Sequence, residues 1–300
     1  MILRTGAATL ALGLAGVAPM GCAEIGSNRT KKVLFFSKSA GFEHSVIKTT
    51  NGQPGLVQKL LAEEGPKHGI EFTFSKDGSL FTPEYLEQFD ALYFHTTGDL
   101  TTAGGDGNPA MTPAGKQAFL DAVSNGKGFI ASHCASDTFH TIEDAAHPDR
   151  SRNKNFGENA DPYIRMLGGE FLTHGNQQKS TMHVVDTAFP GIPKADFGFT
   201  EEWYSLKDFA PDLHVILVQQ TEGMEGDIYH RAPYPATWAR KHGKGRVFYT
   251  SMGHRDDVWT NPTFQSVLFG GIAWAVRNVN ASIPPNMAEV TPKALELHAA

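Results

Sequence analysis

Short apolar runs alternate with helical stretches along the first half of the chain, and this alternation constrains the fold more than any other feature. Val33-Leu34-Phe35-Phe36 is a continuous apolar run, typical of a strand buried on both faces of a sheet. Further strands are expected over 71–74, 91–94 and 128–132, with helices over 53–67, from 82 onward and over 112–125. This rhythm predicts an α/β fold with a doubly wound, mostly parallel sheet that carries helices on both faces.

The second half of the chain is richer in strands. A polar stretch over 140–159 predicts a long loop, followed by a short helix over 162–167. Strands are expected over 182–185, 214–218, 236–240 and 247–249, with a hairpin turn at 242–245 and a closing helix over 261–276. Residues 31–281 therefore predict one domain, and residues 282–300 a C-terminal tail.

Residues 1–23 are typical of an export signal. Arg4 is the only charge there, and Ala7 to Ala18 form an apolar run too short to span a bilayer. Small residues that suit an ordinary signal peptidase follow, but Pro19-Met20-Gly21-Cys22 also resembles a lipoprotein cleavage box. We therefore expect an exported protein, periplasmic or envelope-associated, with Cys22 either removed or carrying a lipid anchor.

The composition excludes some classes of partner and of fold. The formal net charge is −6 and no Lys/Arg run is present, so a nucleic-acid surface is not expected. The chain has 2 cysteines, and Cys134 has no partner once Cys22 is set aside. The mature domain is thus expected to lack an internal disulfide and to depend on its core for stability.

Histidines follow four of the predicted strands. His95 and His133 come directly after their strands, whereas His44 and His254 follow theirs after short loops. Ligands bind at the carboxyl ends of the strands in a doubly wound sheet, so these side chains are expected to line one pocket. Imidazole can serve there as acid, base or metal ligand.

Five segments in order carry a family resemblance. They are 39–44 (SAGFEH), 128–137 (GFIASHCASD), 168–171 (GGEF) with His174, 201–204 (EEWY) and 245–254 (GRVFYTSMGH). Over Lys31 to Val276 the chain resembles the trehalose-utilisation (ThuA-like) family, whose fold is flavodoxin-like and of the class I glutamine amidotransferase type. Glu43 replaces a common arginine and Glu201 a common aspartate, which weakens any transfer of substrate detail.

The amidotransferase fold raises the question of a cysteine nucleophile. Enzymes of that fold carry it on a tight strand-to-helix turn flanked by glycines, and aligning 128–132 with that strand puts His133 at the position. Cys134 is one residue further on, and Ser132 and Ala135 replace the glycines. A small buried thiol is the favoured interpretation, and a hydrolase that uses Cys134 is the alternative.

The remaining candidates each leave two interpretations open. Asp137 either orients His133 or caps the following helix. Glu202 and Tyr204 share a face of a probable strand, and either contact substrate or lie in solvent. His174 follows Gly168-Gly169, a turn that allows a ligand to approach the backbone closely. Trp259 either stacks on a sugar ring or packs in the core.

Imidazole and carboxylate ligands suit zinc, manganese or iron, so a divalent metal is a further possibility, although the compact His-x-x-x-His motif is absent. The candidate metal ligands are His44, His133, His174, Glu202 and His254.

The resemblance implies a carbohydrate-active protein, with disaccharides or keto-glycosides as substrates and general acid-base catalysis as the chemistry. The candidate catalytic residues are His133, Asp137, Glu202, Tyr204 and His254, and the candidate substrate-binding residues are His44, His95, His174 and Trp259. The alternatives are a non-catalytic sugar-binding module and the hydrolase that uses Cys134, since a fold does not determine a function.

Overall fold

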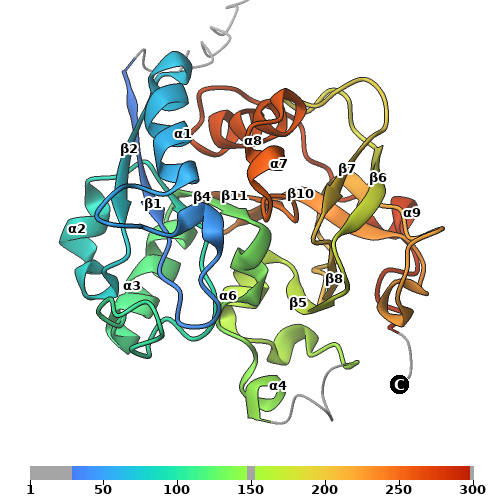
Figure 1. The fold of residues 1–300 in the computed structure, drawn as a ribbon, viewed down its shortest axis with the longest axis horizontal. Helices are drawn as coiled ribbons and strands as arrows, with labels where there is room; N and C mark the ends of the chain where they lie inside the picture. The colour runs from blue at the N-terminus through green and yellow to red at the C-terminus, as the bar shows by residue number, and fades with distance from the viewer. Residues whose placement is uncertain (1–28, 147–152, 298–300) are drawn as a thin grey trace, which may run out of the picture.

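The computed structural model describes residues 29–146 and 153–297, so the expected signal segment with Cys22 lies outside the described residues. One sheet of nine strands forms the centre of this part of the chain, in the order β2-β1-β3-β4-β11-β10-β9-β6-β7 (Figure 1). The strands of this sheet are β1 (Lys31–Phe36), β2 (Ile70–Ser75), β3 (Ala91–Phe94), β4 (Gly128–Ser132), β6 (Gln178–Val184), β7 (Phe197–Glu201), β9 (His214–Gln219), β10 (Tyr234–His242) and β11 (Gly245–Thr250). A separate pair, β5 (Glu170–His174) and β8 (Tyr204–Lys207), is antiparallel.

The sheet confirms the predicted α/β fold and is mixed in strand direction. The pairs β1–β2, β1–β3, β3–β4 and β4–β11 are parallel, and the pairs from β11 through β10, β9 and β6 to β7 are antiparallel. The antiparallel half begins at the predicted hairpin, where Gly243 adopts a φ of 56° and His242 pairs with Gly245. Tight turns join antiparallel neighbours, whereas parallel strands need longer crossovers.

Eight α-helices surround the sheet in the described residues. They are α1 (Leu56–Glu64), α2 (Pro83–Glu87), α3 (Pro113–Ser124), α4 (Ile142–Ala146), α6 (Pro162–Leu167), α7 (Asp256–Trp259), α8 (Pro262–Ala275) and α9 (Met287–Val290). Thr112 begins α3 by accepting a hydrogen bond from Gly115 N, and Asn261 begins α8 by accepting one from Thr263 N. A proline follows each cap, which is a favoured helix start.

The apolar run at β1 divides its side chains between two cores. Leu34 and Phe36 belong to the hydrophobic cluster that includes α3 and α6, whereas Val33 and Phe35 belong to the cluster that includes α1 and α8. Successive strand residues point to opposite faces, so a strand covered on both sides must be apolar at every position. Figure 1 shows α1 and α8 together on one side of the sheet and α3 and α6 on the other.

Two segments have more structure than the sequence predicted. The expected loop after residue 140 contains α4, and the expected tail contains α9. Asn286 ties the second segment to β9, because its side chain bonds both the backbone N and the backbone O of Val215. Met287 and Ala294 are buried there, so this segment packs on the domain. No helix of residues 29–146 and 153–297 is long and apolar enough to span a membrane.

Candidate functional site

Four side chains from distant parts of the sequence converge at the carboxyl edge of the sheet. His44 follows β1, His133 follows β4, His254 follows β11, and Glu202 lies in the connection between β7 and β8. One ligand atom from each of these residues lies within 4.8 Å of the other three. In the strand order β2-β1-β3-β4, β2 is added on one side of β1 and β3 on the other, so the winding order reverses between β1 and β3; ligands bind at this switch point in such sheets. We call these four residues the histidine cluster.

His133 occupies the strained turn at the end of β4, as the sequence alignment predicted. Its φ is 44°, a left-handed conformation that is costly for a residue with a side chain, and its side chain is fully buried. Its carbonyl accepts hydrogen bonds from Tyr249 OH at 2.9 Å and Ser136 Oγ at 3.1 Å. Its Nδ1 donates to the carbonyl of Ser251 at 2.9 Å. A carbonyl can only accept, so the lone pair of His133 is on Nε2, which is directed into the cluster.

Glu202 holds the cluster together electrostatically. Its Oε2 lies 3.0 Å from His254 Nδ1 and 3.6 Å from His133 Nε2, and His254 Nδ1 lies 3.3 Å from His133 Nε2. Burial favours the neutral acid, but hydrogen bonds and charge interactions with these two histidines outweigh it and lower the pKa of Glu202. Burial likewise works to lower the pKa of His254, but the Glu202 carboxylate outweighs it and raises that pKa.

His44 and His95 are neutral imidazoles at the switch point. Burial and the neighbouring histidines lower the pKa of His44 to about 2, and burial lowers that of His95 well below its usual value. His95 Nδ1 bonds Ser132 Oγ at 2.9 Å and its ring is fully buried, with the His44 ring 5.8 Å away. His95 is thus fully buried behind His44, and its role in substrate binding stays a prediction.

Tyr204 and His174 extend the site from the small β5–β8 sheet. The Tyr204 ring lies 4.0 Å from that of His133, centroid to centroid, and burial raises the pKa of its phenol well above the usual value. His174 stacks on Tyr204 at 5.9 Å, and its Nδ1 lies 3.5 Å from Glu202 Oε1. The His174 side chain is 44% exposed, so it is the histidine of this group that solvent reaches most easily. Glu202 and Tyr204 do not share a strand as expected, because Glu202 lies in the connection before β8, but both side chains contact His133.

Two sequence-based interpretations fail because the side chains have other partners. Asp137 turns to His140, whose Nε2 lies 2.6 Å from Asp137 Oδ1, and neither orients His133 nor caps a helix. His140 Nδ1 also bonds Glu170 Oε1 at 2.8 Å. Trp259 is fully buried and donates from Nε1 to the carbonyl of Gly253 at 2.7 Å, so it packs in the core and cannot stack on a sugar.

The thiol of Cys134 is poorly suited to nucleophilic attack. The side chain is fully buried, and burial raises the thiol pKa well above its usual value. A nucleophilic cysteine needs a lowered pKa and access to substrate. The environment of Cys134 therefore favours the expected small buried thiol over the hydrolase alternative.

Sequence reasoning missed two residues beside the cluster. Glu201 is fully buried, and its Oε2 accepts hydrogen bonds from the backbone N–H groups of Gly253 at 3.0 Å and His254 at 3.1 Å. Phe42 is 68% exposed, and its ring contacts that of His44 edge-on at 5.1 Å. The signal for Glu201 was a second acid next to Glu202, and the signal for Phe42 was an aromatic residue two positions before a candidate histidine.

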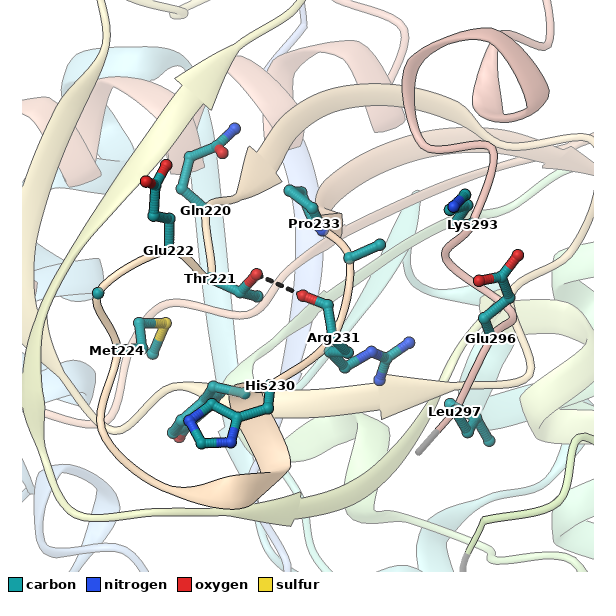
Figure 2. Close-up of a pocket in the computed structure, with 13 residues that line it drawn as sticks. Gln220, Thr221, Glu222, Met224, His230, Arg231, Pro233, Lys293, Glu296 and Leu297 are labelled. Carbon is teal, nitrogen blue, oxygen red and sulfur yellow. Dashed lines mark hydrogen bonds between the residues drawn. The ribbon is translucent and has the colours of Figure 1, made fainter. Parts of the chain in front are cut away.

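Two surface hollows differ in their relation to the cluster. One of 350 Å³ is lined by His254 together with Ser45, Gln177 and residues 255–257, and so opens beside the cluster. A cavity of 910 Å³ lies between residues 220–224, 229–233 and the C-terminal segment at 293–297 (Figure 2). In it Thr221 Oγ1 donates to the carbonyl of Arg231. None of the candidate residues lines this second cavity, whereas His254 lines the first.

Comparison with known proteins agrees with this architecture. No curated protein matches the sequence significantly. A putative ThuA-like protein from Bacteroides uniformis has 18% identity and a TM-score of 0.56, with 89% of this chain and 98% of that one covered. One from Parabacteroides merdae has 18% identity and a TM-score of 0.55, with 86% and 94% covered. These likenesses show the fold, and the family described as trehalose utilisation (ThuA) matches residues 32–275. The chain therefore belongs to the ThuA family.

Proposed function

We propose that this protein is a carbohydrate-active enzyme that cleaves keto-glycosides, including oxidised disaccharides, by proton abstraction next to the keto group. The observation that carries the proposal is the convergence of His44, His133, Glu202 and His254 within 4.8 Å, beside the exposed imidazole of His174. The expected export signal over 1–23 would place this reaction in the periplasm or at the envelope.

The reaction needs a base that can reach the substrate, and His174 meets this need. Its Nδ1 donates to the carbonyl of Gly175 at 3.0 Å, so its lone pair is on Nε2. Glu202 Oε1, at 3.5 Å from Nδ1, helps to orient the ring so that Nε2 faces away from Glu202. His133, a candidate catalytic residue from the sequence, is fully buried against Tyr204 and suits a binding role better than that of the base.

The proposed steps follow the electrons of a 3-keto-glycoside. His174 Nε2 removes the proton from the carbon between the ketone and the anomeric carbon, and the electrons of that C–H bond form an enediolate at the ketone. The enediolate then collapses, the bond between the anomeric carbon and the glycosidic oxygen breaks, and His174 returns the proton to that oxygen. The products are an alcohol and an unsaturated keto sugar, with no external reductant or oxidant.

Phe42 is the proposed sugar platform, in place of the buried Trp259. Its ring is exposed at the edge of His44, and apolar faces of sugar rings pack on aromatic faces. The backbone behind it is fixed, because the carbonyl of Phe42 accepts a hydrogen bond from Thr97 Oγ1 at 2.9 Å. A sugar held on Phe42 lies next to the histidine cluster.

The test is incubation of the purified protein with 3-keto-glycosides in deuterated water. We expect release of the aglycone. We also expect deuterium next to the ketone in recovered substrate, where the enediolate has been reprotonated before the glycosidic bond breaks. Thermal stabilisation by the same sugars with neither exchange nor release would overturn the enzyme and favour a sugar-binding module. A covalent adduct on Cys134 during turnover would instead support the hydrolase.

A further inference from the structure

The spacing of the histidine cluster matches the ligand spacing around a metal ion. The His254 Nδ1–Glu202 Oε2, His254 Nδ1–His133 Nε2 and His133 Nε2–Glu202 Oε2 distances are 3.0, 3.3 and 3.6 Å. Ligand atoms bound to zinc at roughly 2.0–2.1 Å in a tetrahedral arrangement lie about 3.3 Å apart. Three donor atoms are therefore already at the separations that a single ion requires.

The protonation pattern of His133 is that of a metal ligand. Its Nδ1 donates to the carbonyl of Ser251 at 2.9 Å, which leaves the Nε2 lone pair free toward the cluster. Histidines that bind metals commonly donate their other ring N–H to a carbonyl or carboxylate in this way. Such a bond fixes both the tautomer and the orientation of the ring.

His44 supplies an independent sign that a ligand is needed. Its side chain is 3% exposed, and its buried Nδ1 has no hydrogen-bond partner among the described residues. Its ring lies 5.0 Å from that of His133 and 5.1 Å from that of His254, centroid to centroid. Buried polar atoms normally have a hydrogen-bond partner or bind an ion. The unpaired Nδ1 of His44, in a ring packed against two other imidazoles, therefore favours a bound ion at this position.

The charge of the cluster also favours a cation. The Glu202 carboxylate, if no cation is bound to it, would repel an enediolate formed beside it. A divalent ion reverses that sign and can bind the keto oxygen as a Lewis acid. The four residues would complete a tetrahedral set, so a substrate oxygen would enter as a fifth ligand from the hollow beside His254.

We propose that His44, His133, Glu202 and His254 bind one divalent first-row transition-metal ion, of the zinc, manganese or iron(II) class. Imidazole with carboxylate is the donor set that such ions share. The proposal adds a cofactor to the function proposed above and relies on it only for the role of the ion, since binding is measured without any sugar. His174, also a candidate ligand from the sequence, stays outside the set as the base.

The test is metal binding by the full chain after treatment with a chelator. We expect about one equivalent of Zn²⁺ or Mn²⁺ by titration calorimetry and elemental analysis, and a visible absorption band when Co²⁺ is added. Loss of one outer-shell partner typically weakens metal binding about 10–100-fold, so Glu202→Gln and His254→Ala are expected to weaken it by at least that factor. Far-UV circular dichroism of the metal-free variants checks that each one folds.

His183→Ala is the matched control. His183 is an exposed imidazole on β6, outside the cluster, and it pairs with Asp196. It should bind metal as the parent does. Substoichiometric binding by the folded parent, or equal binding by the parent and by folded His254→Ala, would overturn the metal site. Metal binding without keto-glycoside turnover would uphold the site and reject the proposed reaction. Equal turnover by the metal-free and the metal-loaded protein would uphold the reaction and reject the role of the ion in it.

Discussion

Glu201 Oε2 accepts a hydrogen bond from the backbone N–H of His254 at 3.1 Å, and so ties the end of β7 to the loop after β11. Its Oε1 accepts from Glu202 N at 2.8 Å. One buried carboxylate thus positions two members of the histidine cluster through their backbones.

Glu201→Gln keeps the size of the side chain but places an amide NH₂ group where one of these accepting oxygens now lies. We expect kcat to fall and the free energy of unfolding to drop by about 1–3 kcal/mol, the cost of unsatisfied buried groups. Glu201→Asp, the residue common at this position in the family, should rescue part of the kcat. Recovery of kcat in Glu201→Asp would show that Glu201 positions the site and does not only stabilise the fold. Equal kcat in all three proteins would contradict this positioning role.

Cys134→Ser is expected to keep most of the activity. The thiol is fully buried with a raised pKa, so the proposed reaction does not use it. Initial rates and mass spectrometry of the protein during turnover provide the check. Complete loss of activity in a folded variant would show that the thiol takes part.

The free energy of unfolding should depend on pH through His140. Burial lowers its pKa, but Asp137 and Glu170 outweigh burial and raise it from 6.5 to about 10. Because the folded-state pKa is the higher one, the stabilisation is fully present below pH about 6.5 and is lost as the pH rises through about 10.

Urea unfolding of the parent and of His140→Asn at pH 6, 8 and 10, roughly spanning that window, measures this contribution. We expect the difference between the two proteins to shrink as the pH rises. His183→Asn, which removes an exposed ion pair, should change stability little at any pH. A His140→Asn difference that is constant across the range would show that His140 carries no extra proton in the folded state.

Phe42→Ala should raise KM for keto-glycosides more than it lowers kcat. Aromatic packing beyond buried area is worth about 0.5–1.5 kcal/mol, which corresponds to roughly a 2- to 12-fold change in KM. Ile142→Ala is the matched control, because Ile142 is an exposed apolar residue on α4. Equal KM values for the Phe42 variant and the parent would remove Phe42 from the sugar site.

The sequence predicted the part of the site that the parallel sheet determines. His44, His133 and His254 follow parallel strands, so the topology alone brings them to one edge. The sequence did not predict the pairing of β5 with β8, because both strands are short and their pairing is interrupted by a register shift between Phe171 and Thr173. The partner of Asp137 could not be predicted either, since His140 reaches it only through the turn after β4.

Burial separated the candidates that sequence spacing had left equal. Trp259 and His95 carry residue types that bind sugars, but packing against other side chains removes both from the surface. Phe42 has no strand or helix pattern of its own, and only the fold shows that its ring is exposed beside His44. Exposure of a loop residue depends on contacts distant in sequence, which a single sequence does not contain.

The central claim is that the histidine cluster and His174 form an active site for proton abstraction from keto-glycosides. The most direct measurement is the rate of deuterium exchange next to the ketone of a 3-keto-glycoside, compared between the parent, His174→Ala and His183→Ala. General-base catalysis typically contributes about 10²- to 10⁴-fold, so His174→Ala should lose that factor and His183→Ala should match the parent. Equal exchange rates in His174→Ala and His183→Ala, with both variants folded, would contradict the claim.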